Sequence, residues 1–221
     1  MAHNNKSILD LLGDDHIGNY DHQPLRADAF AIPDDEKIML IADKFRDIMN
    51  IMGMDLSDDS LKGTPLRVAK MYIQESFSGL NPVNKPEITL FENKYKYQQM
   101  LIERDIQFYS CCEHHFQPFF GKAHVAYVST GKVIGLSKLN RIVQYYAQRP
   151  QVQERLTKQI AKEISQVLET DDVAVKIEAA HLCVASRGIK DTHSSTITVD
   201  YLGAFLNDEQ KRNEFLRLLS K

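Results

Sequence analysis

Cysteine is scarce in this sequence, because the 221 residues include only three, Cys111, Cys112 and Cys183. Two of them are adjacent, so the set does not have the spacing of a disulfide framework in a small secreted domain. Free thiols are typical of proteins kept in a reducing compartment, where they are available as metal ligands. The cysteine content therefore predicts a cytoplasmic protein.

Long hydrophobic runs are also missing. No stretch approaches the roughly 18 consecutive apolar residues of a membrane span, and the opening MAHNNKSILDLLGDD lacks the apolar core of a secretory signal. The formal net charge is only −3, so we expect neither a nucleic-acid nor a membrane partner, and any anion site must be a local cluster of Lys and Arg. The pattern Gly-x-x-x-x-Gly-Lys-Ser/Thr is absent, which excludes a P-loop nucleotidase.

The length and the apolar content of 43% fit one sizeable globular domain with a helical extension. Residues 1–33 are polar, and we expect a flexible N-terminal tail with one short helix around Ile8–Leu12. Residues 34–85 carry apolar side chains at intervals of three and four, which predicts an N-terminal helical region. Residues 86–221 form the main domain, which ends in a C-terminal helix.

Alternating apolar patterns begin after residue 86. Strands are predicted in EITLFENK, MLIERDIQFYS and KAHVAYVSTGKVIGLS. Two helices follow, over SKLNRIVQYYAQR and PQVQERLTKQIAKEISQVLE, and then the strands VAVKIEAAHLCVAS and HSSTITVDYLGAF. This order predicts an α+β fold, an antiparallel sheet with two helices on one face, preceded by an N-terminal helix pair.

The stretch CCEHHFQPFFG, residues 111–121, gathers thiol and imidazole groups. Cys112 and His115 have the spacing Cys-x-x-His, and because strand alternation would place them on opposite faces, the chain must turn there. Cys183 is the one distant thiol that can join them. On a strand predicted over residues 173–185, His181 and Cys183 point the same way, about 7 Å apart. Two thiolates and one imidazole leave a fourth position open, as in catalytic zinc sites.

A reduced core cluster would give the same residues, since cysteine is among the most buried residue types. The two histidines beside the cluster, His114 and His181, favour a metal site with acid–base groups that titrate near neutrality. Cys111 alternates away from Cys112 and is interpreted as a packed thiol.

Basic residues at predicted helix starts indicate an anion site. Ser137, Lys138 and Arg141 begin one helix, and Arg67 and Lys70 begin another, where positive charge opposes the helix dipole unless an anion is bound. Arg187 follows the predicted Cys183 strand. Each residue alone is more typical of a solvated basic face, but three clusters around one candidate metal centre favour a polyphosphate.

Glu154 lies in the first turn of the second predicted helix, where an acidic residue is favoured in any case. A guanine base presents two parallel donors, its ring N–H and its exocyclic amine, and a carboxylate accepts from both at once. Gln153 is placed to add a second contact.

Four segments resemble GTP cyclohydrolase I, the zinc enzyme family that opens folate and pterin biosynthesis. They are DDSLKGTPLRVAKMY, CCEHHFQPFFGKAHVAYV, VIGLSKLNRIVQYYAQRPQVQERLT and HLCVASRGIKD. Together, in this order, they make the resemblance specific over roughly residues 35–220. The resemblance implies the tunnelling fold (T-fold) and a ring-shaped homodecamer of two pentamers, with its sites between subunits.

The resemblance also implies a role for each candidate residue. Zinc would be bound by Cys112, His115 and Cys183, and a zinc-activated water would attack carbon 8 of the guanine of GTP. His114, His181 and Ser137 would be catalytic, with both histidines moving protons. The implied substrate-binding residues are Glu154, Gln153, Lys138, Arg141, Arg187, Arg67 and Lys70. The products would be 7,8-dihydroneopterin triphosphate and formate.

Two alternatives remain from the sequence. The first is another tunnelling-fold enzyme that acts on a pterin or purine, although relatives of that kind use different residues. The second is a non-enzymatic guanine-nucleotide sensor with a structural zinc, which would not need two spare histidines beside its metal. Release of formate from GTP separates both from the cyclohydrolase interpretation.

Overall fold

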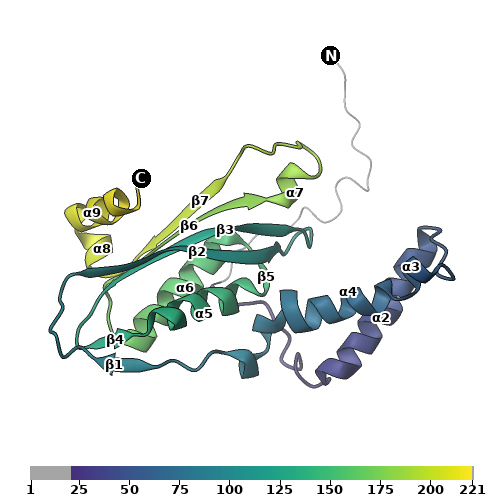
Figure 1. Ribbon diagram of the computed structural model, residues 1–221, viewed down its shortest axis with the longest axis horizontal. Helices are drawn as coiled ribbons and strands as arrows, with labels where there is room; N and C mark the ends of the chain where they lie inside the picture. Colours follow the sequence, from purple (N-terminus) through teal and green to yellow (C-terminus); the bar gives the residue numbers. More distant parts are fainter. Residues whose placement is uncertain (1–20, 221) are drawn as a thin grey trace, which may run out of the picture.

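The computed structural model describes residues 21–220 (Figure 1). The short helix expected around Ile8–Leu12 lies outside the described residues. Residues 21–33 contain bends and turns but no helix or strand. The division into a tail, a helical region and a main domain stays a prediction. Within the described residues, no helix is both long enough and apolar enough to cross a membrane.

The helical region begins with α2 (Asp34–Ile51), whose first turn carries three acidic residues that complement the helix dipole. The short α3 (Asp59–Lys62) leads into α4 (Thr64–Lys70), and Ile38 and Ala42 of α2 pack on Ala69 of α4. The chain continues through the π-helix η1 (Met71–Ser76) and then two 3₁₀ turns, η2 (Ser78–Leu80) and η3 (Pro82–Asn84). The predicted helix pair is therefore present.

Four long strands form the main sheet, β2 (Met100–Cys112), β3 (Pro118–Val128), β6 (Val173–His181) and β7 (Thr196–Tyr201). Each is antiparallel to its neighbour, and the two-residue β5 (Pro150–Gln151) adds to the outer edge of β2 in parallel. A separate pair, β1 (Leu90–Glu92) with β4 (Lys132–Ile134), lies at one end of the molecule (Figure 1). The predicted α+β fold is confirmed.

Two helices, α5 (Leu136–Ala147) and α6 (Gln153–Leu168), cover one face of this sheet (Figure 1). Their apolar stripes meet the side chains that alternate toward that face on β3 and β6, and together they form the main core. The members contributed by β6 are Val173, Val175, Ile177 and Ala179. The opposite face is covered at one end by α8 (Ala204–Asn207) and α9 (Glu209–Leu219), through Phe205 and Phe215.

The helical region is attached to the sheet domain beside the end of α5. The Gly79 N–H donates to the Gln148 carbonyl at 3.0 Å, and the Lys85 ammonium lies 2.8 Å from the buried Glu163 carboxylate of α6. Tyr72 and Phe77 pack edge-on against Phe116, which belongs to the β2–β3 hairpin loop. These contacts set the helical region against the loop that carries the candidate metal ligands.

The strand predicted over residues 173–185 ends earlier than expected. β6 stops at His181, and Leu182–Ala185 form the short helix α7. The reason is the loss of partners: Phe119 is the last residue of β3 that pairs with β6, and β7 pairs no further than Ala179. His181 and Cys183 are therefore not neighbours on one strand face. Small apolar residues such as those of HLCVA fit a helical turn as well as a strand.

Gly121 offers a test of the sheet's close packing. It lies within β3, and a Cβ added there would collide with the main chain of Glu178 and Ala179 on β6. We expect Gly121→Ala to lower the free energy of unfolding by about 3 kcal/mol, because backbone atoms cannot move aside as a side chain can.

Urea denaturation at fixed protein concentration measures this change. Gly135→Ala is the matched control, since its Cβ would meet only ordinary contacts at 3.7 and 3.8 Å, and it should cost about 1 kcal/mol or less. Equal stability of the two variants would contradict the expected clash.

Candidate metal centre and active site

The candidate site is built on the turn between β2 and β3. The Cys112 N–H donates to the Gln117 carbonyl at 2.8 Å, and the Phe116 N–H donates to the Cys112 carbonyl at 2.8 Å. Phe116 adopts a positive φ of 52°, which is unusual for a bulky residue and needs support from its surroundings. That support comes from the rings of Tyr72 and Phe77. The turn expected after Cys112 is confirmed.

Cys112, His115 and Cys183 converge, and one ligand atom from each lies within 4.8 Å of the others. Cys112 comes from the end of β2, His115 from the loop and Cys183 from α7. Two sulfurs and one imidazole nitrogen are soft donors that suit zinc, whereas calcium and magnesium select oxygen ligands. The donor set therefore fits a zinc ion with three protein ligands and one open position.

The thiols at this corner differ in their surroundings. Burial raises the pKa of the Cys183 thiol, and the neighbouring Cys112 raises it further, while the charge of Arg187 lowers it. Burial raises the pKa of Cys111 to about 11, so this thiol stays neutral. Cys111 faces a separate pocket of about 300 Å³ and is outside the ligand group.

Two histidines accompany the three ligands. His114 lies on the loop with Nδ1 3.8 Å from the Cys112 sulfur and Nε2 3.9 Å from a Glu113 carboxylate oxygen. His181 ends β6, where its ring stacks flat on Phe119 of β3, with centroids 4.6 Å apart. Burial lowers the pKa of His181, and the Glu154 carboxylate opposes this effect. Nε2 of His181 also lies 2.8 Å from the amide oxygen of Gln153, the residue before Glu154, so the start of α6 lies beside this corner.

A bidentate ion pair clamps the loop to helix α6. The Arg155 guanidinium donates to both Glu113 carboxylate oxygens, at 2.6 and 2.9 Å, and the Arg155 side chain is only 3% exposed. The Glu113 N–H also donates to the Gln151 carbonyl at 3.0 Å. Sequence reasoning missed this pair. The sequence features that could have indicated this ion pair are the acidic Glu113 between the candidate ligands and the arginine that follows Glu154.

The start of α5 lies far from this corner in the same chain. Asn140 donates to the Glu103 carboxylate at 3.2 Å, so the first turns of α5 lie beside the early part of β2. From Glu103 to Cys112 the strand extends roughly 30 Å, at about 3.3 Å per residue. Exposed Ser137 and Arg141, and the half-buried Lys138, therefore belong to the opposite end of the sheet.

The predicted cationic residues of the helical region are both exposed on α4. Arg67 donates to the Ser60 carbonyl at 3.0 Å and to the Thr64 hydroxyl at 2.8 Å. Lys70 is the last residue of α4 rather than one of its first, so the expected conflict with the helix dipole does not apply to it. The structure thus joins the candidate metal ligands, the two histidines, Gln153, Glu154 and Arg187, whereas Ser137, Lys138 and Arg141 lie at the other end of the sheet.

Comparison with known proteins decides the family. The family model described as GTP cyclohydrolase I matches residues 41–220. GTP cyclohydrolase 1 of Flavobacterium johnsoniae is 56% identical over 213 residues, which cover 96% of this chain and 95% of that protein. GTP cyclohydrolase 1 of Escherichia coli is 51% identical over 194 residues, covering 88% of this chain and 87% of the relative.

The chain belongs to the GTP cyclohydrolase I family. Its strand–strand–helix–helix–strand–strand order is the tunnelling fold expected for this family. Among solved structures, the apo form of the archaeosine synthase QueF-Like matches with a TM-score of 0.38 and 16% identity, covering 48% of this chain and 94% of that one.

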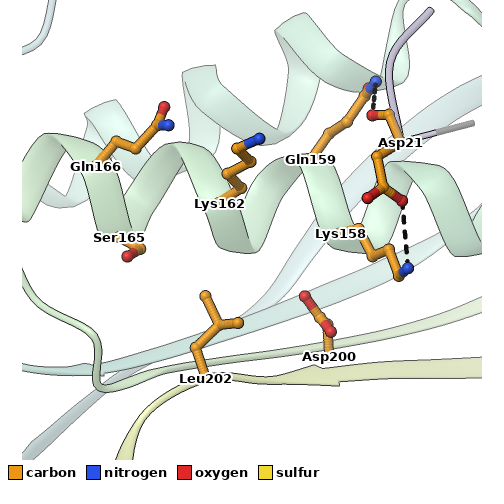
Figure 2. Close-up of a pocket in the computed structure, with 8 residues that line it drawn as sticks. All are labelled: Asp21, Lys158, Gln159, Lys162, Ser165, Gln166, Asp200 and Leu202. Carbon is orange, nitrogen blue, oxygen red and sulfur yellow. Dashed lines mark hydrogen bonds and ion pairs between the residues drawn. The ribbon is translucent and has the colours of Figure 1, made fainter.

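A pocket of about 400 Å³ lies apart from the family motifs, between α6 and β7 (Figure 2). Lys158 and Lys162 of α6 line one side of it, and Asp200 and Leu202 line the other. Asp21 closes one end through contacts with Lys158 and Gln159, at 3.2 Å each. None of the candidate site residues lines this pocket, so its size does not mark the active site of this member of the GTP cyclohydrolase I family.

Removal of one thiol tests the ligand group. We expect Cys183→Ser to reduce the zinc bound per chain severalfold, because a neutral hydroxyl is a much weaker zinc ligand than a thiolate. Elemental analysis of the purified protein measures the metal. Cys111→Ser is the matched control and should keep its zinc, since Cys111 faces the other pocket. Full zinc in Cys183→Ser, or its loss only in Cys111→Ser, would refute the assignment.

Proposed function

We propose that this chain converts GTP and water to 7,8-dihydroneopterin triphosphate and formate, at the corner formed by Cys112, His115 and Cys183. The observation that carries the proposal is the convergence of this soft ligand group with two further imidazoles, His114 and His181, in a chain of the GTP cyclohydrolase I family. A purely structural zinc site has no use for spare imidazoles. The reaction is the first step of folate and pterin biosynthesis.

Zinc is the metal that we propose for the ligand group. When bound at three protein ligands, it would lower the pKa of a water molecule toward about 7 and polarise the reacting carbon–nitrogen bond. The protein's own part is to hold the ligands in place. The Glu113–Arg155 pair fixes the loop that carries His115, and the hydrogen bonds at Cys112 fix the end of β2.

His114 and His181 are the proposed proton carriers. Opening the imidazole ring of guanine requires a proton to leave the attacking water and another to reach the departing ring nitrogen, and release of formate repeats this demand. Imidazoles with pKa values near neutrality serve both directions. Burial lowers the pKa of His181, which favours its neutral form and therefore a role as a proton acceptor at the start of the reaction.

Glu154 is the proposed guanine contact. It is exposed in the first turn of α6, near His181, and its carboxylate can accept from the ring N–H and the exocyclic amine together. An N–H near the start of a helix has no acceptor within its own helix, so the Glu154 N–H is the proposed donor to the guanine carbonyl oxygen. A contact from Gln153 would use its main chain, because its side-chain amide is hydrogen-bonded inside the protein.

The triphosphate site is proposed to lie between subunits. Ser137, Lys138 and Arg141 cannot reach the metal corner of their own chain, roughly 30 Å away along β2. A neighbouring copy can supply them, and among the strands of residues 21–220 β7 lies at the edge of the sheet, where a strand of another copy can pair with it. We propose a homodecamer of two pentamers. Arg187 of the metal corner would contact the phosphates, and Arg67, Lys70 and the catalytic Ser137 would complete the site.

A cytoplasmic location is part of the proposal, because two of the three zinc ligands are thiolates and thiols stay reduced there.

Incubation of the zinc-quantified protein with GTP tests the function. We expect formate and a pterin, detected by its fluorescence after oxidation, to appear together and to be lost when a chelator removes the metal. Restoration by added zinc is the control for chelator damage. Formate without pterin would limit the chain to the hydrolytic steps. Neither product, with zinc bound, would overturn the proposal in favour of a nucleotide sensor.

Replacement of His114 tests the acid–base role. We expect His114→Ala to keep its zinc and its affinity for GTP but to lose about 10²-fold or more in kcat, the usual effect of removing a general acid or base. The control is His124→Asn, at a buried histidine whose Nδ1 accepts from the Asp105 N–H and which lies outside the site. Unchanged turnover in His114→Ala would rule out its catalytic role.

A further inference from the structure

A small hydrogen-bonded ring joins the start of α6 to strand β7 beside His181. Gln153, the first residue of α6, is only 2% exposed. Its amide nitrogen donates to the Thr196 carbonyl at 2.9 Å and to the Thr198 hydroxyl at 3.1 Å, with the Ile177 carbonyl at 3.3 Å. Its amide oxygen lies 2.8 Å from Nε2 of His181.

The two carbonyl groups fix which way the Gln153 amide faces. A carbonyl oxygen can only accept, so the atom that faces Thr196 and Ile177 must be the NH₂ group. A flipped amide would set its oxygen against both carbonyl oxygens, and acceptors that face one another repel. The amide oxygen must therefore face His181.

The two threonines complete the same assignment. The Thr157 hydroxyl donates to the Gln153 carbonyl at 2.8 Å, so its single hydrogen is used. In the 2.6 Å contact between Thr157 and Thr198, the donor is then Thr198. The hydroxyl hydrogen of Thr198 is therefore also used, and the Thr198 oxygen accepts from the Gln153 amide. Every direction in the ring is determined, and none conflicts with another.

An amide oxygen can only accept, so Nε2 of His181 must carry a hydrogen. We propose that Gln153 is a positioning residue that holds a proton on Nε2 of His181 and so assigns Nδ1 as the nitrogen that exchanges protons with the substrate. The relevance to catalysis rests on the proposed role of His181, but the proton assignment does not. The flat stack on Phe119 holds the ring plane in which this bond is made.

This role differs from a guanine contact made by the same side chain. Both polar atoms of the Gln153 amide are already used within the protein, and the residue is buried. A substrate contact would raise KM when it is removed, whereas a positioning role lowers kcat and changes the state of His181.

Nitrogen NMR on the assembled wild-type protein is the first test. The chain is labelled with ¹³C,¹⁵N-histidine, and the His181 signals are identified by their loss in His181→Gln. Carbon–nitrogen correlations separate the two nitrogens, because Nε2 is bonded to Cδ2 and Nδ1 to Cγ. We expect a protonated Nε2 and a bare Nδ1 above neutral pH. A proton on Nδ1 with a bare Nε2 would overturn the proposal.

Gln153→Met supplies the second test, since it keeps the side-chain length and removes both polar groups. We expect the Nε2 proton of His181 to exchange faster with water, both tautomers to be populated, and kcat to fall about 10-fold or more, with KM for GTP within about twofold. Unchanged His181 spectra, or a rise in KM with kcat unchanged, would also overturn the proposal.

Two further variants keep the result interpretable. Gln159→Met removes another buried amide of α6, bonded to Asp21 and Gln151, and should leave the His181 spectrum unchanged. Thr198→Val is the substitute test if Gln153→Met folds poorly. It removes one partner of the Gln153 amide and should lower kcat about threefold, the effect of one lost hydrogen bond. Full turnover in His181→Ala would show that His181 has no catalytic role. The NMR measurement on the wild-type protein would still test the proton assignment.

Discussion

The contact between Glu113 and Arg155 holds the candidate site together. It connects the hairpin loop between β2 and β3 to the first turn of a helix packed in the core. The Arg155 side chain is almost fully buried, so removal of the Glu113 carboxylate would take the opposite charge away from a desolvated cation, which costs more than the pair itself stabilises. Around this pair lie His114 and His115 on one side and Gln153 and Glu154 on the other. The candidate metal ligands and the first turn of α6, which carries the proposed guanine contact, therefore share one support.

The end of the sheet is the second constraint on the chemistry. The β3–β6 pairing stops at Phe119 and His181, and the chain is then free to change direction into α7. That change brings the Cys183 sulfur to the hairpin loop instead of leaving it on a strand face. The candidate site residues lie where the regular pairing of strands ends, because there side chains from a strand, a loop and a helix can converge on one point.

The sequence predicted most of the architecture and named the three candidate ligands that the structure brings together. The strand β6 and the helices α5 and α6 were predicted from the sequence pattern, since alternation and a spacing of three to four follow from local geometry. The continuation of β6 through Cys183 was wrong, because alternation cannot show where a strand loses its partners. The Glu113–Arg155 pair and the Gln153 ring were missed for a related reason. They depend on which polar groups become buried together, and that is a property of the packed chain.

The distance between the two ends of β2 has a genetic consequence. If one substrate needs the metal corner of one chain and the α5 start of another, the two halves of a site are encoded by the same gene but contributed by different copies. A cell that carries one allele damaged at Cys183 and another damaged at Lys138 would assemble mixed rings in which some sites combine two intact halves. Two alleles damaged at the same half could not rescue each other in this way.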